Sequence, residues 1–347
     1  MSRTLRVLLG AWAVAIVGLT AFLTPAVSST TRVVLGLLAA VTLWYVWRWP
    51  QLEQQLSAES ARSGGPVPGG PRRPGVFDLA VGLITNFLDT LGIGNFAPST
   101  AALKFAHRIP DEDIPGTLNV GHALPVLTEA LIFIAAIVVD PRLLIAMIVA
   151  SILGAWLGAG VVARMPRRAI QVGMGSALAV AAALFVAANL KWMPVGGSAT
   201  AFSGTPFVVA VAGNFVLGAL MTLGIGLYAP CLIMLSLLGL DPRAAFPIMM
   251  GSCAFLMPVG GLRFVRSRRY SVGVALGFAL GGPPAVLVAG YLIKSIPLVL
   301  LRWLVVCVVL YAAAMMLISA LRHTRPSEQK ASHETPEVAP DSSTAGE

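Results

Sequence analysis

The sequence predicts an all-α polytopic membrane protein. We expect two inverted repeats, each of a broken or re-entrant helix plus three transmembrane helices, preceded by two extra N-terminal helices. Of the 347 residues 57% are hydrophobic and only 11% are charged, and the mean hydropathy is +0.83. Soluble domains carry about 25% charged residues, because a water-facing surface needs them. Several apolar runs are long enough to span a bilayer, and one Gly/Pro motif occurs twice.

The charge pattern excludes nucleic acid as a partner. The net charge of +9 comes from 24 Lys and Arg against 15 Asp and Glu. The basic residues form short clusters between apolar runs, which is the pattern of cytoplasmic loops in membrane proteins. The three cysteines, Cys231, Cys253 and Cys307, lie inside apolar runs without the Cys/His spacing of a metal site. We therefore expect no metal and no other cofactor.

The first 49 residues hold two candidate spans. Residues 7–23 are followed at 26–28 by a sequence that resembles a signal-peptidase site. The apolar core exceeds the roughly 7–15 residues of a signal peptide, so we expect a retained anchor. Residues 33–49 end in an aromatic belt typical of a membrane interface.

Composition divides the rest of the chain. Residues 50–75 are rich in Gly, Pro and Arg and are predicted to be a cytoplasmic linker. The polar residues 322–347 are predicted to be a disordered cytoplasmic tail. Between them we expect a first transport repeat at 76–190, an extracytoplasmic loop at 191–206, and a second repeat at 207–321.

A duplicated block defines the two repeats. Residues 90–98, TLGIGNFAP, recur as residues 222–230, TLGIGLYAP, at an offset of 132 and with seven of nine residues identical. Apolar spans rich in Gly, Ala and Leu often resemble one another, but a contiguous block of this length is hard to obtain by composition alone. The block therefore indicates that the halves share one architecture.

Each half opens with an interrupted element. Residues 77–91 would form a helix of roughly 22 Å at 1.5 Å per residue, which is too short to cross alone. A short segment, 99–106, follows the Gly/Pro break, and half two repeats this with 207–223 and 231–238. The element is either a kinked full crossing or a re-entrant hairpin. The ordinary spans are expected near 117–139, 143–163 and 169–189, and near 244–263, 271–293 and 297–321.

Charge counting favours the re-entrant hairpin. With the N-terminus and the linker in the cytoplasm, re-entrant hairpins place 18 of the 24 Lys and Arg there, whereas full crossings place 15. Each half then crosses three times, so the halves are inverted. The basic cluster at 263–269 maps back onto 131–137, which carries no charge, as inversion requires. We predict a multi-pass protein of the cell membrane with both termini in the cytoplasm.

The two breaks are the predicted anion site. A broken backbone at membrane depth leaves N–H and C=O groups unpaired, which is tolerated only in a protein-lined cavity. We expect the following half-helices to begin at Ser99–Thr100 and Cys231 and to aim free N–H groups at the midplane, which suits an anion. Gly and Pro also kink or pack helices, but the duplication favours a functional role. The predicted substrate-binding residues are Gly92, Gly94, Asn95, Pro98, Ser99, Thr100, Gly224, Gly226, Pro230 and Cys231.

Polar residues in half one are the predicted proton- or ion-coupling group. Asp89 adjoins the first break, and Asn119, His122 and Glu129 follow at spacings of 3 and 7 that share one helical face. Ionisable groups inside a membrane are expensive and indicate an ion or proton pathway. For His122 we prefer a hydrogen bond between helices over contact with a ligand. The matching positions of half two carry no ionisable residue, so this chemistry belongs to half one.

Other function classes have weaker support. The chain has no H-E-x-x-H, G-x-S-x-G or Walker A motif, so an enzyme is not expected. Asp89 and Glu129 could form a catalytic carboxylate dyad, but the same pair serves proton transport, which leaves an intramembrane enzyme as the third hypothesis. The second is a passive anion channel that uses the two breaks as its filter.

At the duplicated motif the chain resembles the TauE/SafE family of membrane transporters, often called sulfite exporters. Members have two repeated halves that each open with a Gly-rich motif followed by a Pro. Here these residues are Gly92, Gly94 and Pro98, then Gly224, Gly226 and Pro230. Asn95 and Leu227 stand where a further Gly is frequent. The resemblance covers about residues 76–321, with the N-terminal spans as additions to a seven- or eight-span pattern.

The resemblance implies a secondary transporter that exports a small anion across the inner membrane. The implied substrates are sulfite, sulfoacetate or a related sulfur-containing anion. The buried carboxylates of half one add the expectation of proton coupling. The expected partners are a small inorganic or organic anion and the lipid bilayer, and the sequence leaves a homo-oligomer open.

Overall fold

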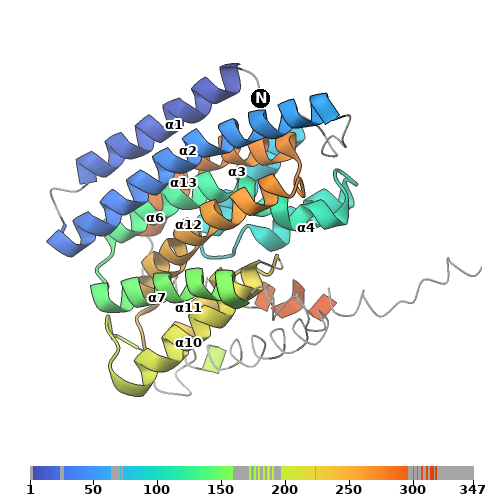
Figure 1. The fold of residues 1–347 in the computed structure, drawn as a ribbon. Helices are drawn as coiled ribbons and strands as arrows, with labels where there is room; N and C mark the ends of the chain where they lie inside the picture. The colour runs from blue at the N-terminus through green and yellow to red at the C-terminus, as the bar shows by residue number, and fades with distance from the viewer. Residues whose placement is uncertain are drawn as a thin grey trace, which may run out of the picture.

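The chain folds into a bundle of helices (Figure 1). The computed structural model describes residues 3–23, 27–63, 71, 73–158, 197–222 and 224–295, with single residues scattered over 172–190 and 300–318. Across these residues the only extended feature is an isolated bridge between Ala199 and Leu240. The expected spans at 169–189 and 297–321 and the tail at 322–347 fall mostly or wholly outside the described residues.

Eleven α-helices are described in full. They are α1 (Arg3–Leu23), α2 (Ser29–Ser63), α3 (Val76–Thr90), α4 (Phe96–Phe105), α5 (Ile114–Gly121), α6 (Ala123–Ala136), α7 (Pro141–Leu153), α10 (Gly204–Met221), α11 (Tyr228–Leu237), α12 (Pro242–Arg266) and α13 (Val272–Ser295). A 3-10 turn, η2 (Asp111–Asp113), precedes α5, and a π-helical turn, η3 (Gly154–Gly158), continues α7.

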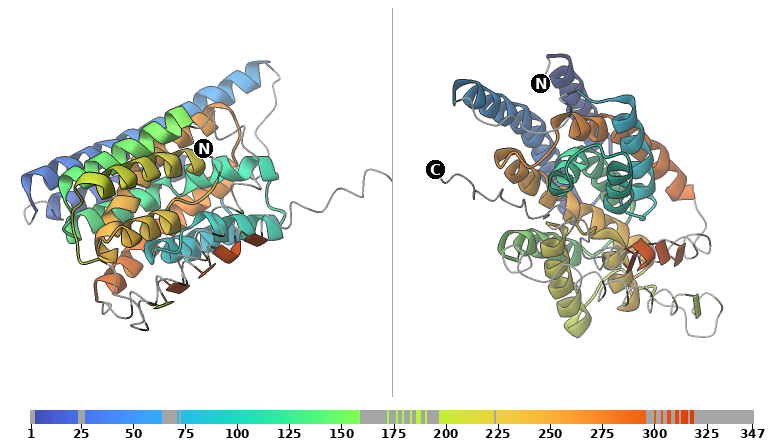
Figure 2. Two further views of the ribbon diagram at one scale, coloured as in Figure 1. Left: turned by 90° about the horizontal axis from the view of Figure 1, so that it is seen from below. Right: turned by 90° about the vertical axis from the view of Figure 1, so that its right-hand side faces the viewer.

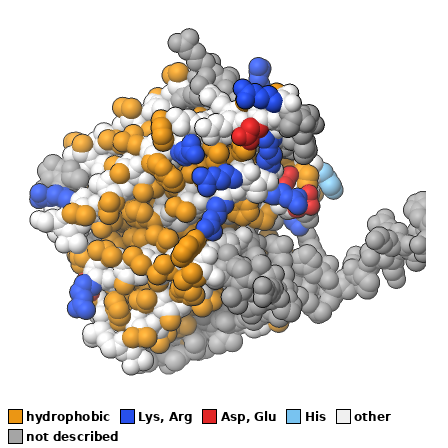
Figure 3. All heavy atoms as spheres, viewed as in Figure 1, with side chains coloured by type: hydrophobic (Ala, Val, Ile, Leu, Met, Phe, Trp, Pro, Cys, Tyr) orange, Lys and Arg blue, Asp and Glu red, His pale blue; other side chains and the backbone are white. Residues whose placement is uncertain are grey.

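Several of these helices can cross a membrane. The stretches long and apolar enough are Ser29–Arg62, Gly204–Met221, Pro242–Arg266 and Val272–Leu292. Helices α5 and α6 add a fifth if they count as one span. Hydrophobic side chains are spread over the described part of the face seen in Figure 3, and most of the Lys and Arg side chains on it lie toward one end. The expected all-helical, multi-pass membrane architecture is confirmed at this level.

Helix α2 is longer than the sequence analysis predicts. It runs to Ser63 through Pro50, so the first half of the expected linker is helix. Residues 51–62 consist largely of Leu, Glu, Gln, Ala and Arg, which are strong helix formers. Glu53 is buried there and accepts a hydrogen bond of 2.6 Å from the Tyr270 hydroxyl, which ties the extension to the loop before α13.

The span predicted near 117–139 is bent rather than straight. Helices α5 and α6 meet at His122 with an angle of 43°. Pro125 lies in the first turn of α6 and has no N–H to donate to the carbonyl of Gly121. The bend follows from this missing bond, and it places His122 at the corner.

The two halves interlock in a repeated pattern. In half one, α3 packs along α13 of half two, and in half two, α10 packs along α7 and η3 of half one. Since α3 corresponds to α10 and α7 to α13, the first helix of each half packs against the equivalent later helix of the other half. Glycines allow the close approach: a Cβ on Gly82 would lie 2.7 Å from Phe278 Cα, and a Cβ on Gly218 would lie 2.1 Å from Ser151 O.

The remaining helices flank this core. Helices α1 and α2 lie side by side along one side of the bundle, and α7, α10 and α11 lie on the opposite side (Figures 1 and 2). Between them, α12 packs against α5, α6 and α7. Helix α12 is therefore the central element that contacts both sides.

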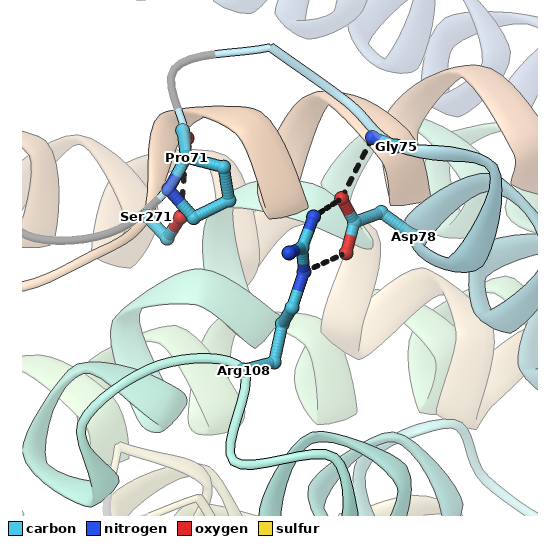
Figure 4. Close-up of polar contacts among 5 residues, drawn as sticks. All are labelled: Pro71, Gly75, Asp78, Arg108 and Ser271. Atoms are coloured by element: carbon cyan, nitrogen blue, oxygen red, sulfur yellow. Dashed lines mark hydrogen bonds and ion pairs between the residues drawn. The ribbon is translucent and has the colours of Figure 1, made fainter.

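The ends of the first broken element meet at one end of the bundle. Arg108, just after α4, pairs with Asp78 in the first turn of α3, with Nη2–Oδ2 at 2.8 Å and Nε–Oδ1 at 3.0 Å (Figure 4). The Gly75 N–H donates to the same carboxylate at 2.8 Å. Helix α3 therefore begins at the end of the bundle where α4 finishes.

The same end gathers two more loops. The Gly273 N–H donates to the Pro71 carbonyl at 2.7 Å, and the Ser271 hydroxyl donates to it at 3.5 Å (Figure 4). Arg269 pairs with Glu112 at 2.6 Å across the two halves. The loop before α3, the turn after α4 and the loop between α12 and α13 thus form one face.

The opposite end joins three other segments. Asp140 and Asp241 cap α7 and α12 by accepting from the N–H two residues on, at 3.0 and 2.8 Å. Their own N–H groups donate to Thr200 and Ala199 carbonyls, at 3.0 and 2.8 Å. The starts of α7 and α12 therefore lie together at the end of the bundle away from Tyr270.

Candidate functional site

Glycines in the left-handed region make both breaks. The backbone φ is 92° at Gly92, 87° at Gly94 and 81° at Gly224, which L side chains rarely adopt. Gly226 is absent from this group of positive-φ glycines. A Cβ there would make an ordinary contact 3.8 Å from Phe96 Cβ, so Gly226 lies against the other break without needing the left-handed region.

The half-helices begin earlier than the sequence analysis predicts. Helix α4 starts at Phe96 and α11 at Tyr228, three residues before the expected positions. The Ser99 N–H is bonded to the Asn95 carbonyl and the Cys231 N–H to the Leu227 carbonyl, each at 3.0 Å. The expectation that these two N–H groups are free is therefore wrong.

The prolines explain that difference. Pro98 and Pro230 occupy the third position of their helices, where no N–H is needed, and they do not mark the first residue. The N–H groups without a partner inside the helix belong to the first turns, beginning at Phe96 and Tyr228.

The two breaks touch each other. A Cβ built on Gly94 would lie 4.0 Å from Tyr228 Cβ, and one built on Gly226 would lie 3.8 Å from Phe96 Cβ. These contacts are equivalent under the repeat, because Gly94 corresponds to Gly226 and Phe96 to Tyr228. The pair of contacts brings the tips of the two broken elements, Gly94–Phe96 and Gly226–Tyr228, together inside the bundle, where Phe96 and Tyr228 are buried.

A small pocket lies between the tips. Its free space is close to that of one water molecule, so it is closed to larger ligands in this conformation. The lining residues are Asp89, Gly94, Asn95, Phe96, Val126, Met221, Gly226, Leu227, Tyr228, Cys253 and Met257. Both halves contribute, with the polar side chains of Asp89 and Asn95 coming from half one.

Glu129 connects the two breaks. Its Oε1 accepts a hydrogen bond from the Thr90 hydroxyl at 2.8 Å, and its Oε2 accepts one from the Tyr228 hydroxyl at 2.8 Å. Thr90 ends α3 before the first break, and Tyr228 begins α11 after the second. The fully buried carboxyl group of α6 is thus held by both halves.

Asp89 is the second buried carboxyl group of the site. Its Oδ2 accepts from Asn95 Nδ2 at 2.6 Å, and the same nitrogen donates to Asn86 Oδ1 at 3.2 Å. The Asp89 and Glu129 carboxyl groups are also close enough to interact electrostatically. Two buried carboxylates that interact in this way cannot both remain charged at modest cost.

His122 extends the network away from the pocket. One ring nitrogen, Nδ1, bonds to Asn86 Oδ1 at 3.0 Å, and Nε2 bonds to the Ser99 hydroxyl at 3.0 Å. The ring also stacks on Phe278 with centroids 4.6 Å apart. These are bonds between helices, as the sequence analysis prefers for this residue.

Some predicted site residues lie outside this network. Asn119 donates to the Pro115 carbonyl of its own helix at 2.9 Å. Thr100, Pro98 and Pro230 are half-buried and are not among the pocket's lining residues. Cys231 is buried on α11 and is likewise no part of the lining.

Three network residues are missing from the predicted site. Thr90 and Tyr228 were visible in the duplicated block, and Asn86 lies one turn before Asp89. The one available signal is at Tyr228, where half two carries a hydroxyl and half one carries Phe96. Met221, Cys253 and Met257, which line the far wall, look like ordinary apolar residues in the sequence.

The arrangement suits protons better than metals. Among the described residues no group of three His, Cys, Asp or Glu side chains could hold a metal ion. The pocket is lined by one carboxyl group, an amide and a phenol, and the phenol is hydrogen-bonded to the second carboxyl group, that of Glu129. All four groups are buried, and the two carboxyl groups can bind and release protons. A small ligand that enters it would contact both breaks.

Comparison with known proteins gives one match. A family model described as "Sulfite exporter TauE/SafE" matches residues 1–185 and 206–343. The match includes the N-terminal helices, which we expected to be additions to the family pattern. Neither a curated protein nor a solved structure matches the chain. The chain belongs to the TauE/SafE family, and is a multi-pass membrane protein of a family that transports sulfite and related anions.

Proposed function

We propose that the protein is a proton-coupled secondary transporter of a small sulfur-containing anion, such as sulfite or sulfoacetate. The anion would bind between the two helix breaks. One observation carries the proposal: Glu129, the buried carboxyl group beside the pocket, is hydrogen-bonded to both breaks at once. The charge state of Glu129 therefore affects its hydrogen bonds to both halves.

The proposal includes re-entrant hairpins in inverted halves. The Asp78–Arg108 pair supports this, because both ends of the first hairpin lie at one end of the bundle. A full crossing would separate them by about 30 Å of hydrocarbon. The starts of α7 and α12 lie together at the other end, bridged by residues 199–200. A full-crossing topology would put these two starts on opposite membrane faces.

The orientation follows from charge. The end that holds Arg108 also holds the exposed side chains of Arg263, Arg266 and Arg269. Under the positive-inside rule this end is cytoplasmic, and both termini lie on that side. We propose the plasma membrane as the location of the protein.

Donors for an anion converge on the pocket from both halves. Asn95 Nδ2 comes from half one and the Tyr228 hydroxyl from half two, and the first turns of α4 and α11 add backbone N–H groups. Each donor now bonds to a carboxyl group, Asn95 to Asp89 and Tyr228 to Glu129. An arriving anion would compete for these donors, so it would loosen the contact between the breaks.

This competition gives a mechanism for alternating access. With Glu129 bonded to Thr90 and Tyr228, the tips are held together and the pocket is closed. Protonation of the carboxyl pair weakens the hydrogen bonds that the pair accepts from these donors. The donors can then bind the anion. The two breaks can then separate, and the interlocked helices of the halves can move against each other.

The test is flux into proteoliposomes that hold purified protein. Sulfite, sulfoacetate, sulfate and chloride are compared with and without a pH gradient. Saturable, pH-dependent movement of sulfite or sulfoacetate supports the transporter. Ohmic single-channel currents would identify a passive channel instead. Transport of none of the four anions would reject the proposed function.

A further inference from the structure

The pocket between the breaks is acidic, although the family carries anions. Asp89 lines it directly, and Glu129 interacts electrostatically with Asp89 and accepts a hydrogen bond from Tyr228. None of the described lining residues is a Lys or an Arg. An anion that enters the pocket therefore meets negative charge without a balancing cation, in surroundings where charge interactions are strong.

Among the described residues, the titratable groups near the carboxyl pair are His122 at the α5–α6 corner, Tyr228 and Cys231 on α11, and Cys253 on α12. Of these, only His122 could supply a positive charge. His122 is not part of the lining, and Asn86 and Asn95 stand between it and Asp89. The described residues of α10 and α13 add no titratable group to the lining.

Electrostatics then fixes the sign of the coupling. An anion placed beside a carboxyl group favours the neutral, protonated form of that group. Linkage is reciprocal, so protonation of Asp89 or Glu129 must favour anion binding by the same factor. Protons and anions would compete for the site only if the anion displaced a bound proton, and no described feature of the pocket produces that effect.

We propose that the anion and a proton bind together and move through the protein in the same direction. This inference rests on the proposed function and adds the direction of coupling to it. The Asp89–Glu129 pair, or the anion itself, carries the proton while the anion occupies the pocket. Binding of a monoanion together with one proton then leaves the net charge of the site unchanged.

Two consequences follow for transport. An inward proton gradient would drive uptake of the anion, and outward movement would be driven by the anion's own gradient. An exporter built on this site would not run by exchange of an anion for an incoming proton. The membrane potential would have little effect on transport of a monoanion with one proton.

The experiment counts protons during sulfite binding. The purified, full-length protein in detergent at pH 8, with little buffer and a pH indicator, is mixed with sulfite. We expect net uptake of about one proton per bound sulfite, and an affinity that tightens by about tenfold per unit fall in pH across the titration of the pair. Glu129→Gln should reduce the uptake and flatten the pH dependence. Glu112→Gln, on the cytoplasmic surface, is the matched control and should behave as wild type.

The outcomes separate this inference from the proposed function. Sulfite binding with proton release, or with no proton change in the wild type, would overturn the co-binding of anion and proton while leaving the transporter in place. Full wild-type uptake in a folded Glu129→Gln protein would rule out Glu129 as the proton carrier, and full uptake in Asp89→Asn as well would rule out the carboxyl pair. If Glu129→Gln does not fold, the sign of the wild-type proton count still decides. No binding of sulfite at any pH would reject the proposed function itself.

Discussion

The Tyr228 hydroxyl donates a hydrogen bond of 2.8 Å to the carboxyl group of Glu129, and so joins the second helix break to a helix of the first repeat. Tyr228 occupies the position of Phe96 in the other repeat, and the Cβ atom of each lies near the glycine of the opposite break. The backbone contacts between the tips are thus symmetric, and the polar contact is not. Both buried carboxyl groups of the site, Asp89 and Glu129, belong to half one, and half two contacts Glu129 through the Tyr228 hydroxyl.

Tyr228→Phe tests that contact. The substitution keeps the ring and reproduces the Phe96 side of the repeat, but it removes the only hydrogen bond from the second break to Glu129 among the described contacts. A hydrogen bond to a charged group contributes about 1.5–3 kcal/mol. We expect pH-dependent sulfite transport to fall about tenfold or more, with the protein still folded.

The matched control is Tyr45→Phe. Tyr45 is also fully buried and also donates one hydrogen bond, to the Val120 carbonyl at 2.7 Å, but it is not part of the pocket. It should change thermal stability without changing the pH profile of transport. Equal pH profiles for Tyr228→Phe and the wild type would show that the second break does not sense Glu129.

The two break glycines should respond differently to alanine. Both have room for a methyl group, with nearest atoms at 4.0 Å for Gly94 and 3.8 Å for Gly226. Gly94 has a φ of 87°, whereas Gly226 is not in the left-handed region. The left-handed conformation costs an L residue about 1–2 kcal/mol. Gly94→Ala should therefore lower stability and transport more than Gly226→Ala, and equal losses would argue against the backbone geometry described for the breaks.

The ion pair at the base of the first hairpin should matter more than a surface pair. Asp78 is fully buried, and the hydrogen bond to it is the main cause that raises the pKa of the Arg108 guanidinium. Arg108→Ala leaves that carboxylate without its cation. Because Arg108 is 32% exposed, we expect a loss of about 2 kcal/mol rather than the ~3–5 kcal/mol of a fully buried pair.

Arg269→Ala is the control for this prediction. Arg269 and Glu112 are 53% and 66% exposed, so their pair should contribute no more than about 1 kcal/mol. Thermal unfolding in detergent measures both variants. A similar shift in melting temperature for the two would mean that the hairpin base is not held by Asp78 and Arg108.

Accessibility tests the topology. Single cysteines at Ala106 and Ser267 should resist a membrane-impermeant thiol reagent added outside cells, in a background without native cysteines. A cysteine at Ser198, near the bridge at Ala199, should react. All three positions are exposed in the structure. Reaction of the 106 site from outside would contradict a re-entrant first hairpin.

The breaks and the buried acids could be predicted because their signals are local. The glycines and the proline of each break lie within one short block of sequence, and this block recurs at a fixed offset. Asp89 and Glu129 stand out because carboxyl groups are costly in the middle of a membrane span. The bend at His122 had a local signal as well, in Pro125, and could have been predicted.

The contacts across the halves could not be predicted in the same way. Thr90 and Tyr228 meet through Glu129 only after three distant segments pack together. The difference between Tyr228 and Phe96 is visible in the duplicated block, but it does not identify Glu129 as the partner of the hydroxyl. The start of α4 was missed because Pro98 tolerates any position of the first turn, so it does not fix the first residue. The extension of α2 was missed because a Gly/Pro-rich stretch follows it directly.

The most direct test of the shared site is a crystal soaked with selenite, which has the shape and charge of sulfite and an anomalous scatterer at its centre. The account predicts an anomalous peak between the two breaks, within hydrogen-bonding distance of Asn95 and Tyr228, with the Glu129–Tyr228 bond broken. A peak elsewhere, or one that contacts a single break while Tyr228 still bonds to Glu129, would contradict it.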